Sequence, residues 1–292
     1  METLATVGLS FERQFWQKER LVSPYGQALV VDVQPETLTD QIPILIAPGW
    51  SEDCQTYRKT LSAAFNLGRR ALSLGYSRLS GGVIENEGYP EVELRKALLI
   101  LDALKEKGID RVDVIAHSEG AINVLIAAMV NSSGFRNIVL DKPAGLIGKD
   151  TKPALMGRFI KMLFEETIIR PPLFTDPTSS NRTDTRTAFY IAEDPARVTK
   201  EIDAMITFEI RDLMKVLHDT GIMFSVISGV NDPLFPVSKQ IEYMRKSGEP
   251  SVGGYYSVIG GHNELSIHPN KHAVLALDAL NGLQRKRELA SQ

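Results

Sequence analysis

The sequence has almost no cysteine and no long apolar run. Cys54 is the single cysteine, which excludes an internal disulfide and a multi-cysteine metal site. No stretch approaches the roughly 18 apolar residues that a membrane-spanning helix needs. The first twenty residues carry charged side chains where a signal peptide would have an apolar core. We therefore expect no membrane span and a cytoplasmic location.

An excess of positive charge is also lacking. Lys and Arg number 33 against 36 Asp and Glu, a net charge of −3, so we expect no binding of nucleic acid. The apolar share of 43% is that of a globular protein. A chain of 292 residues can form one large domain with an insertion, or two ordinary domains. None of these features specifies an oligomeric state.

Strand-like and helix-like segments alternate over most of the chain, which predicts helices packed around a mainly parallel sheet. The expected strands cover 27–33, 42–47, 70–74, 111–116, 135–140, 222–228 and 255–259. The expected helices cover 56–67, 91–107, 119–130 and 270–283. A glycine-rich loop around Gly75, Gly81 and Gly82 is expected after the third of these strands.

The alternation lapses over 146–208. Four apolar residues there share one helical face: Leu155, Phe159, Met162 and Leu163. A loop is expected over 171–186, and Asp194-Pro195 begins another helix. This segment is a lid over an apolar substrate pocket, an ordinary helical layer, or an interfacial membrane helix. We favour the lid, with Leu155, Phe159 and Met162 in contact with substrate.

A serine lies between an apolar strand and a long apolar helix, in Ala116-His117-Ser118-Glu119-Gly120. A sharp strand–turn–helix corner would expose the hydroxyl of Ser118, and such a corner needs small flanking residues. The usual pattern is Gly-x-Ser-x-Gly, and Ala116 is small enough to replace the first glycine. We expect Ser118 to be a nucleophile and His117 to have a structural role.

A serine hydroxyl becomes reactive when a histidine accepts its proton and a carboxylate fixes the tautomer of that histidine. His262 lies in a Gly-Gly-His loop directly after a strand, and we expect it to be the base. The other four histidines are expected to be structural. Asp232, in an Asn-Asp-Pro turn after another strand, is the favoured acid. Asp141 is the alternative, because it also ends a strand.

The strand 42–47 is followed by Pro48-Gly49-Trp50-Ser51. A glycine at this point allows a backbone N–H to approach a ligand closely. We expect the amides of Trp50 and Glu119 to bind a tetrahedral oxyanion. The Trp50 indole would also form a wall of the substrate pocket. The alternative is a plain tight turn at the end of a strand.

Together these motifs resemble those of the α/β-hydrolase superfamily. The resemblance covers roughly 27–283 and departs at Pro48-Gly49, where many members carry His-Gly. It implies a mostly parallel eight-stranded sheet flanked by helices, with a helical cap inserted after the sixth strand. The core would then comprise 1–145 and 209–292, and the cap 146–208. The resemblance implies chemistry without a cofactor.

The order serine, aspartate, histidine predicts a serine hydrolase of carboxylic esters that works through a covalent acyl-enzyme. We expect the substrate to be a small-molecule ester with a small to medium apolar acyl group, and we expect no metal to take part. Two alternatives stay open. One is hydrolysis of a C–C, thioester or amide bond by the same triad, and the other is a ligand receptor with vestigial turnover.

Overall fold

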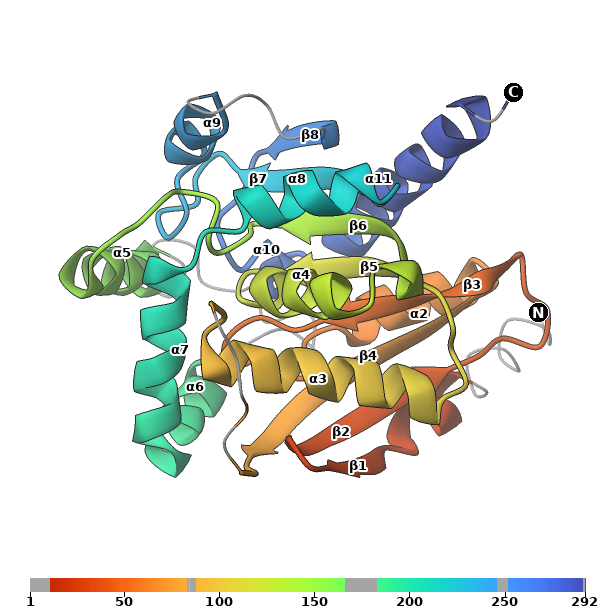
Figure 1. Cartoon of the computed structure of the whole chain (residues 1–292), viewed down its shortest axis with the longest axis horizontal. Helices are drawn as coiled ribbons and strands as arrows, with labels where there is room; N and C mark the ends of the chain where they lie inside the picture. Colours follow the sequence, from red (N-terminus) through yellow and green to blue (C-terminus); the bar gives the residue numbers. More distant parts are fainter. Residues whose placement is uncertain (1–10, 83, 85–87, 166–182, 246–251, 291) are drawn as a thin grey trace.

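An eight-stranded sheet forms the centre of the computed structural model, which describes residues 11–82, 84, 88–165, 183–245, 252–290 and 292 (Figure 1). The spatial order is β1-β2-β4-β3-β5-β6-β7-β8. The strands are β1 (Glu19–Ser23), β2 (Gly26–Val33), β3 (Asp40–Ala47), β4 (Arg69–Leu79), β5 (Val112–His117), β6 (Phe135–Asp141), β7 (Met223–Gly229) and β8 (Val252–Val258). Pairing is antiparallel between β1, β2 and β4 and parallel from β4 to β8, so the predicted fold class is confirmed.

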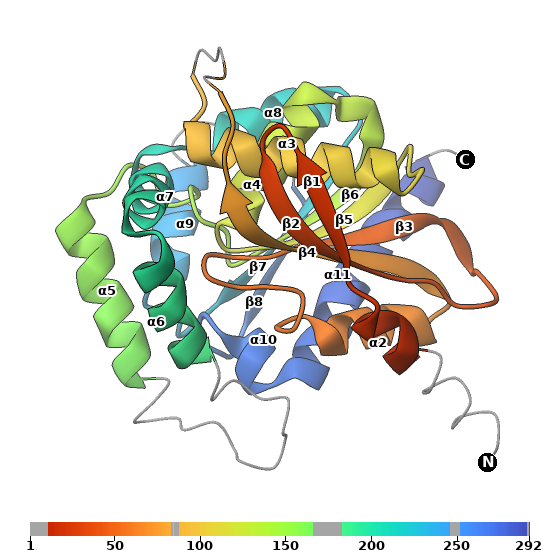
Figure 2. The ribbon, with the colours of Figure 1, turned by 90° about the horizontal axis from the view of Figure 1, so that it is seen from below.

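Helices cover both faces of the sheet (Figure 2). One face carries α2 (Arg58–Asn66) and α11 (Pro269–Ala290), and the opposite face carries α3 (Glu91–Glu106), α4 (Gly120–Val130) and α8 (Arg211–Asp219). Each face has its own cluster of buried apolar side chains. The sheet is therefore buried on both sides, which is why its central strands are continuous apolar runs.

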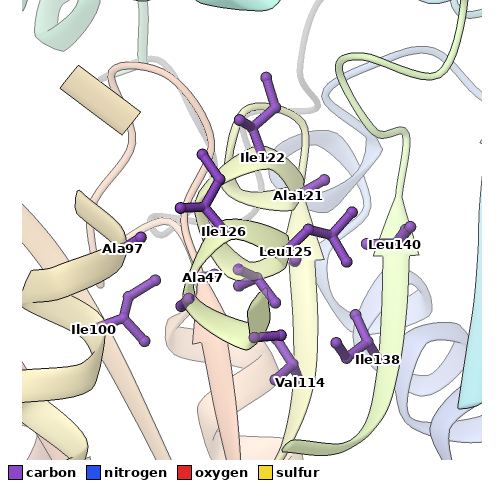
Figure 3. Close-up of a cluster of buried hydrophobic side chains, with 14 of the residues drawn as sticks. Ala47, Ala97, Ile100, Val114, Ala121, Ile122, Leu125, Ile126, Ile138 and Leu140 are labelled. Atoms are coloured by element: carbon purple, nitrogen blue, oxygen red, sulfur yellow. The ribbon is translucent and has the colours of Figure 1, made fainter. Parts of the chain in front are cut away.

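The helix α4 is apolar almost all round because it packs against both the sheet and α3. Figure 3 shows Ile126 of α4 next to Ala97 of α3, while Leu125 points toward Leu140 of β6. All of these side chains are buried. Burying each such side chain contributes about 1.5–3 kcal/mol relative to leaving it in water. This packing fixes the position of the start of α4, and with it the residues just before that helix.

Three helices between β6 and α8 lie beyond the carboxyl ends of the central strands (Figures 1 and 2). We call α5 (Lys152–Phe164), α6 (Thr183–Glu193) and α7 (Pro195–Thr207) the cap helices. Asp194 accepts a hydrogen bond from the Arg197 amide and caps α7, as the Asp194-Pro195 pair predicts. The insertion follows the sixth strand, as expected, and its extent over 146–208 stays a prediction.

Several expected boundaries differ from the structure. The strand β4 continues to Leu79 in antiparallel pairing with β2, so Gly75 lies in a strand and not in a loop. The edge strand β1 has no strong apolar signal, because four of its five residues are at least partly exposed. Residues 171–182 of the predicted loop over 171–186 lie outside the described residues. The remaining residues, 183–186, form the start of α6. Two further short helices are α9 (Val237–Arg245) and α10 (Glu264–Ile267).

Across the part of the chain that the structure describes, no helix has the length and apolar character needed to cross a bilayer.

Candidate active site

The backbone turns sharply at Ser118, between the end of β5 and the start of α4. Its φ of 51° lies in the left-handed region that residues with a side chain rarely adopt. Gly120 makes the turn possible, because a Cβ there would lie 2.7 Å from the Ala47 carbonyl oxygen and 2.6 Å from that of Pro48. The turn therefore presses the start of α4 against the end of β3, and it projects the serine side chain beyond the sheet.

The structure brings the three predicted residues Ser118, His262 and Asp232 together. The Ser118 Oγ lies 3.1 Å from His262 Nε2, and His262 Nδ1 lies 2.9 Å from Asp232 Oδ2. All three residues are buried, so the hydrogen bonds form in a region of low dielectric constant. With Nδ1 donating to the carboxylate, Nε2 is left as the nitrogen that can accept the serine proton.

The two oxygens of Asp232 have different partners. Its Oδ1 accepts hydrogen bonds from the amides of Leu234 and Phe235, at 2.8 and 3.1 Å, which leaves Oδ2 for His262. Burial would raise the pKa of Asp232, but the charge and hydrogen bond of His262 and the Phe235 amide together hold it below its usual value. The carboxylate is therefore ionised and fixed in orientation before any substrate binds.

The loops that carry Asp232 and His262 are bonded to each other. Val230 N donates to the Val258 carbonyl at 2.8 Å, and Asn231 N donates to the Gly260 carbonyl at 3.0 Å. Gly229 allows this approach, because a Cβ there would lie 2.7 Å from the Gly260 oxygen. The spacing between acid and base is thus set by backbone bonds as well as by the pair itself.

Asp141, the alternative acid, has other partners. Its Oδ2 lies 2.6 Å from His272 Nε2, and its Oδ1 lies 2.8 Å from the Lys142 ammonium. All three residues are buried. Both oxygens of Asp141 are therefore occupied by groups other than His262, and the geometry favours Asp232 for the triad.

His117 joins the loop after β3 to the loop that carries His262. Its Nδ1 lies 3.0 Å from Glu52 Oε2, and its Nε2 lies 3.3 Å from the His262 carbonyl oxygen. Both neighbours are acceptors, so the ring donates from both nitrogens as an imidazolium. Burial would lower the pKa of His117, but the Glu52 carboxylate raises it above its usual value. This is consistent with the structural role expected for His117.

Glu52 is a residue whose role at the site the sequence did not reveal. Besides His117, its carboxylate accepts hydrogen bonds from the Gly49 amide, at 2.7 Å, and from the Tyr57 hydroxyl. Burial acts to raise the pKa of Glu52, but His117 and these donors lower it to about 2. The ionised carboxylate holds the Gly49 turn in place, although its position three residues past a glycine carries no distinct sequence signal.

The backbone amides of Trp50 and Glu119 come from neighbouring strand ends, because Ala47 of β3 pairs with Ala116 of β5. In the described part of the chain, neither amide has a hydrogen-bond acceptor. Gly49 keeps the two loops close, since a Cβ there would lie 3.1 Å from the Ser118 Cβ. The Trp50 and Glu119 amides are therefore free to donate to a ligand, and their role as an oxyanion hole stays a prediction.

Comparison with known proteins finds similar folds and no similar sequence. No family model and no curated protein matches the chain. Among solved structures, a thermophilic esterase from Thermogutta terrifontis is similar with a TM-score of 0.61 at 14% identity, covering 91% of this chain and 99% of that one. The chain has the α/β-hydrolase fold. The resemblance predicted from the motifs is confirmed at the level of the fold.

Other structures with this fold differ in their named activities. A bromoperoxidase from Bacillus anthracis has a TM-score of 0.64 at 13% identity, covering 90% of this chain and 100% of its own. An enol-lactonase from Burkholderia xenovorans has a TM-score of 0.61 at 14% identity, covering 87% of this chain and 96% of its own. Similarity at these identities shows the fold, and the activity must be argued from the site.

In this α/β-hydrolase fold a cavity of about 220 Å³ lies between Ser118 and the cap helices. The predicted substrate contacts Trp50, Leu155, Phe159 and Met162 all line it. Further apolar lining residues are Met156, Leu163, Ile191, Val198, Ile202, Met205 and Leu234. Three of these residues, Val198, Ile202 and Met205, lie on α7 at intervals of four and three. This helical spacing in the sequence could have identified them as one apolar face. Ser118 and His262 also line this cavity.

The residues that the structure describes contain no group of three or more His, Cys, Asp or Glu side chains arranged to hold a metal ion.

Proposed function

We propose that this protein is a serine hydrolase that cleaves carboxylic esters, with Ser118 as nucleophile, His262 as base and Asp232 as the orienting acid. The observation that carries the proposal is the continuous pair of hydrogen bonds, 3.1 and 2.9 Å long, that ends at a serine facing an apolar cavity. The similarity of the fold to an esterase and an enol-lactonase supports hydrolysis as the general class of reaction.

The geometry supports the following steps of an acyl transfer. His262 Nε2 accepts the proton of Ser118 as its Oγ attacks the ester carbonyl, and the ionised Asp232 stabilises the imidazolium that forms. The amides of Trp50 and Glu119 donate to the oxyanion, where a single donor contributes roughly 3–4 kcal/mol. His262 then protonates the leaving alcohol. A water molecule activated by His262 finally hydrolyses the acyl-enzyme.

The cavity restricts the size and polarity of the substrate. Its volume of about 220 Å³ and its mainly apolar lining suit a small to medium acyl chain. Met156, Met162 and Met205 line the wall, and flexible methionines adapt to chains of different shape. We propose that the substrate places an apolar acyl group under the cap helices.

The test is a panel of p-nitrophenyl esters from acetate to decanoate, together with matched thioesters and amides. We expect the highest kcat/KM at a short to medium acyl length. The Ser118→Ala variant should lose roughly 10⁵- to 10⁶-fold in kcat and should not react with a fluorophosphonate probe. Circular dichroism and Tm establish that the variant is folded. Turnover at the wild-type rate in folded Ser118→Ala would refute the proposal.

The panel also separates the alternatives. Faster turnover of thioesters or amides would keep the triad and change the substrate class. Binding of esters that raises Tm with no turnover would indicate a receptor.

A further inference from the structure

A buried lysine lies behind the candidate oxyanion hole. Lys96 projects from α3 and is 1% exposed, and its ammonium lies 2.7 Å from Glu119 Oε1 and 2.8 Å from Glu201 Oε1. Both carboxylates are also buried. Glu119 directly follows the nucleophile, whereas Glu201 lies on the cap helix α7. One ammonium therefore connects the sheet side of the site to the cap.

Glu201 extends this connection to the second amide donor. Its Oε2 accepts a hydrogen bond from the Trp50 indole Nε1 at 2.9 Å, and its Oε1 accepts one from the Tyr190 hydroxyl of α6 at 2.6 Å. Lys96 thus contacts Glu119 directly and reaches Trp50 through Glu201. The two residues whose amides flank Ser118 are both held by the same cation.

The cluster around Lys96 contains a third acid and a second cation. Besides Lys96, Glu119 and Glu201 it contains Glu93, which is buried, and Arg197, whose Nε lies 3.6 Å from Glu201 Oε1. Burial raises the pKa of Glu93 well above its usual value, and the nearby Glu119 carboxylate raises it further. Burial also raises the pKa of Glu119, although the Lys96 ammonium acts to lower it. Such buried ion pairs add little stability compared with apolar side chains of equal volume, so another reason for this cluster is needed.

We propose that Lys96 is a positioning residue for the oxyanion hole, and that it makes the geometry of the hole depend on the seating of the cap helices. The inference rests on the proposed ester hydrolysis. Without Lys96, two carboxylates would lie beside the position where an oxyanion develops, and their repulsion would displace Trp50 and Glu119. The helix α7 also lines the substrate cavity, through Val198, Ile202 and Met205, so the helix that contacts the acyl group also carries Glu201.

The main experiment compares Lys96→Met with Lys96→Arg, which keeps the positive charge. The control is Lys200→Met, because Lys200 lies on α7 with a side chain that is 64% exposed. We expect Lys96→Met to lower kcat for p-nitrophenyl esters about 100-fold, the effect of roughly 1 Å of misplacement, with KM changed less than about threefold. Lys96→Arg should recover most of the loss, and Lys200→Met should match wild type. Equal kcat in folded Lys96→Met and wild type would overturn the proposal.

A second measurement separates positioning of the oxyanion hole from a general structural effect. A trifluoromethyl ketone forms a tetrahedral adduct with the serine and places its oxyanion in the hole. Its affinity should fall in Lys96→Met by about the same factor as kcat/KM. The affinity of an alcohol of the same chain length, which has no oxyanion, should stay unchanged. Equal losses for both ligands would contradict a positioning role.

Variants that remove no charge cover the case in which Lys96→Met does not fold. Trp50→Phe removes the indole N–H that binds Glu201, and Tyr190→Phe removes the hydroxyl bond to the same carboxylate. We expect each to lower kcat about threefold to tenfold with little change in KM. Wild-type kcat in both variants would overturn the proposal. If wild type itself hydrolyses no ester, the proposed function fails, whereas an active wild type with unaffected variants refutes only the role of Lys96.

Discussion

Two buried aspartate–histidine pairs lie at the carboxyl ends of the neighbouring strands β6 and β7. Asp232 is 2.9 Å from His262, and Asp141 is 2.6 Å from His272. The pairs differ in their third partner. His262 has its second nitrogen next to Ser118 at the cavity, whereas the second oxygen of Asp141 binds Lys142.

The third partner determines what each pair can do. His262 lies in a loop where its Nε2 can accept the serine proton, while His272 lies in the first turn of α11. Burial lowers the pKa of His272 in spite of the Asp141 charge, and the Lys142 ammonium lowers it further. A close aspartate–histidine contact is therefore not sufficient to indicate catalysis. Access to a nucleophile and to a substrate cavity is also needed.

The largest expected difference between the pairs is in catalysis. Asp232→Asn keeps the shape of the side chain but permits the wrong tautomer of His262, and we expect kcat to fall about 10⁴-fold. The measurement is ester hydrolysis by folded protein, with Asp141→Asn as the matched control. A larger loss of kcat in Asp141→Asn than in Asp232→Asn would reverse the choice of acid.

Asp141→Asn should affect stability and leave kcat within about threefold of wild type. It leaves the Lys142 charge buried without an anionic partner, which typically costs 3–5 kcal/mol in the free energy of unfolding. Urea denaturation monitored by circular dichroism measures this loss. An unfolding free energy equal to that of wild type would show that Lys142 finds another partner or loses its proton.

A smaller effect should appear in the pH dependence of stability. Because the pKa of His272 is lowered in the folded protein, the unfolded chain binds a proton more readily than the folded chain. As the pH falls, His272 begins to gain this proton in the unfolded chain near pH 6.5. The stabilisation is present above that pH and is lost as the pH falls below it, by at most about 1.4 kcal/mol per pH unit. We expect His272→Gln to remove this part of the slope between pH 7 and 5. The matched control is His268→Gln, which removes an exposed histidine.

The smallest expected effect concerns the orientation of the His262 ring. The Phe235 ring packs edge-on against it with centroids 5.3 Å apart. Such a contact contributes about 0.5–1.5 kcal/mol, so Phe235→Leu should lower kcat roughly twofold to tenfold. Phe224→Leu makes the same change in the core of β7 and should lower Tm without changing kcat. A similar kcat in both variants would show that the ring contact does not orient His262.

Much of the fold was predictable because its elements have strong local patterns. The helix α3 and the strands β3, β5, β6 and β7 lie within two residues of their expected boundaries. The strand β1 was missed because a short edge strand with exposed polar residues resembles a loop. The loop expected around Gly75, Gly81 and Gly82 does include Gly81 and Gly82, but its placement at Gly75 was wrong, because β4 extends past Gly75 in antiparallel pairing with β2.

The candidate site was predictable where a residue type and a strand end coincide. Ser118, Asp232 and His262 each follow a strand, and parallel strands bring their carboxyl ends to one edge. The partners of Lys96 were not predictable in this way. Glu201 lies 2.8 Å from Lys96 but on a helix more than a hundred residues later, and a lysine on an amphipathic helix usually faces solvent. No local pattern specifies a contact of this kind.

The buried pair of Lys96 and Glu201 limits how this chain can be recombined with others of its fold. A grafted cap that has no carboxylate at the position of Glu201 would leave the Lys96 ammonium buried beside Glu119 alone. Chimeras built to change substrate preference should therefore keep Glu201, Tyr190 and Arg197 in the grafted cap. Otherwise Lys96 and its partners should be replaced together.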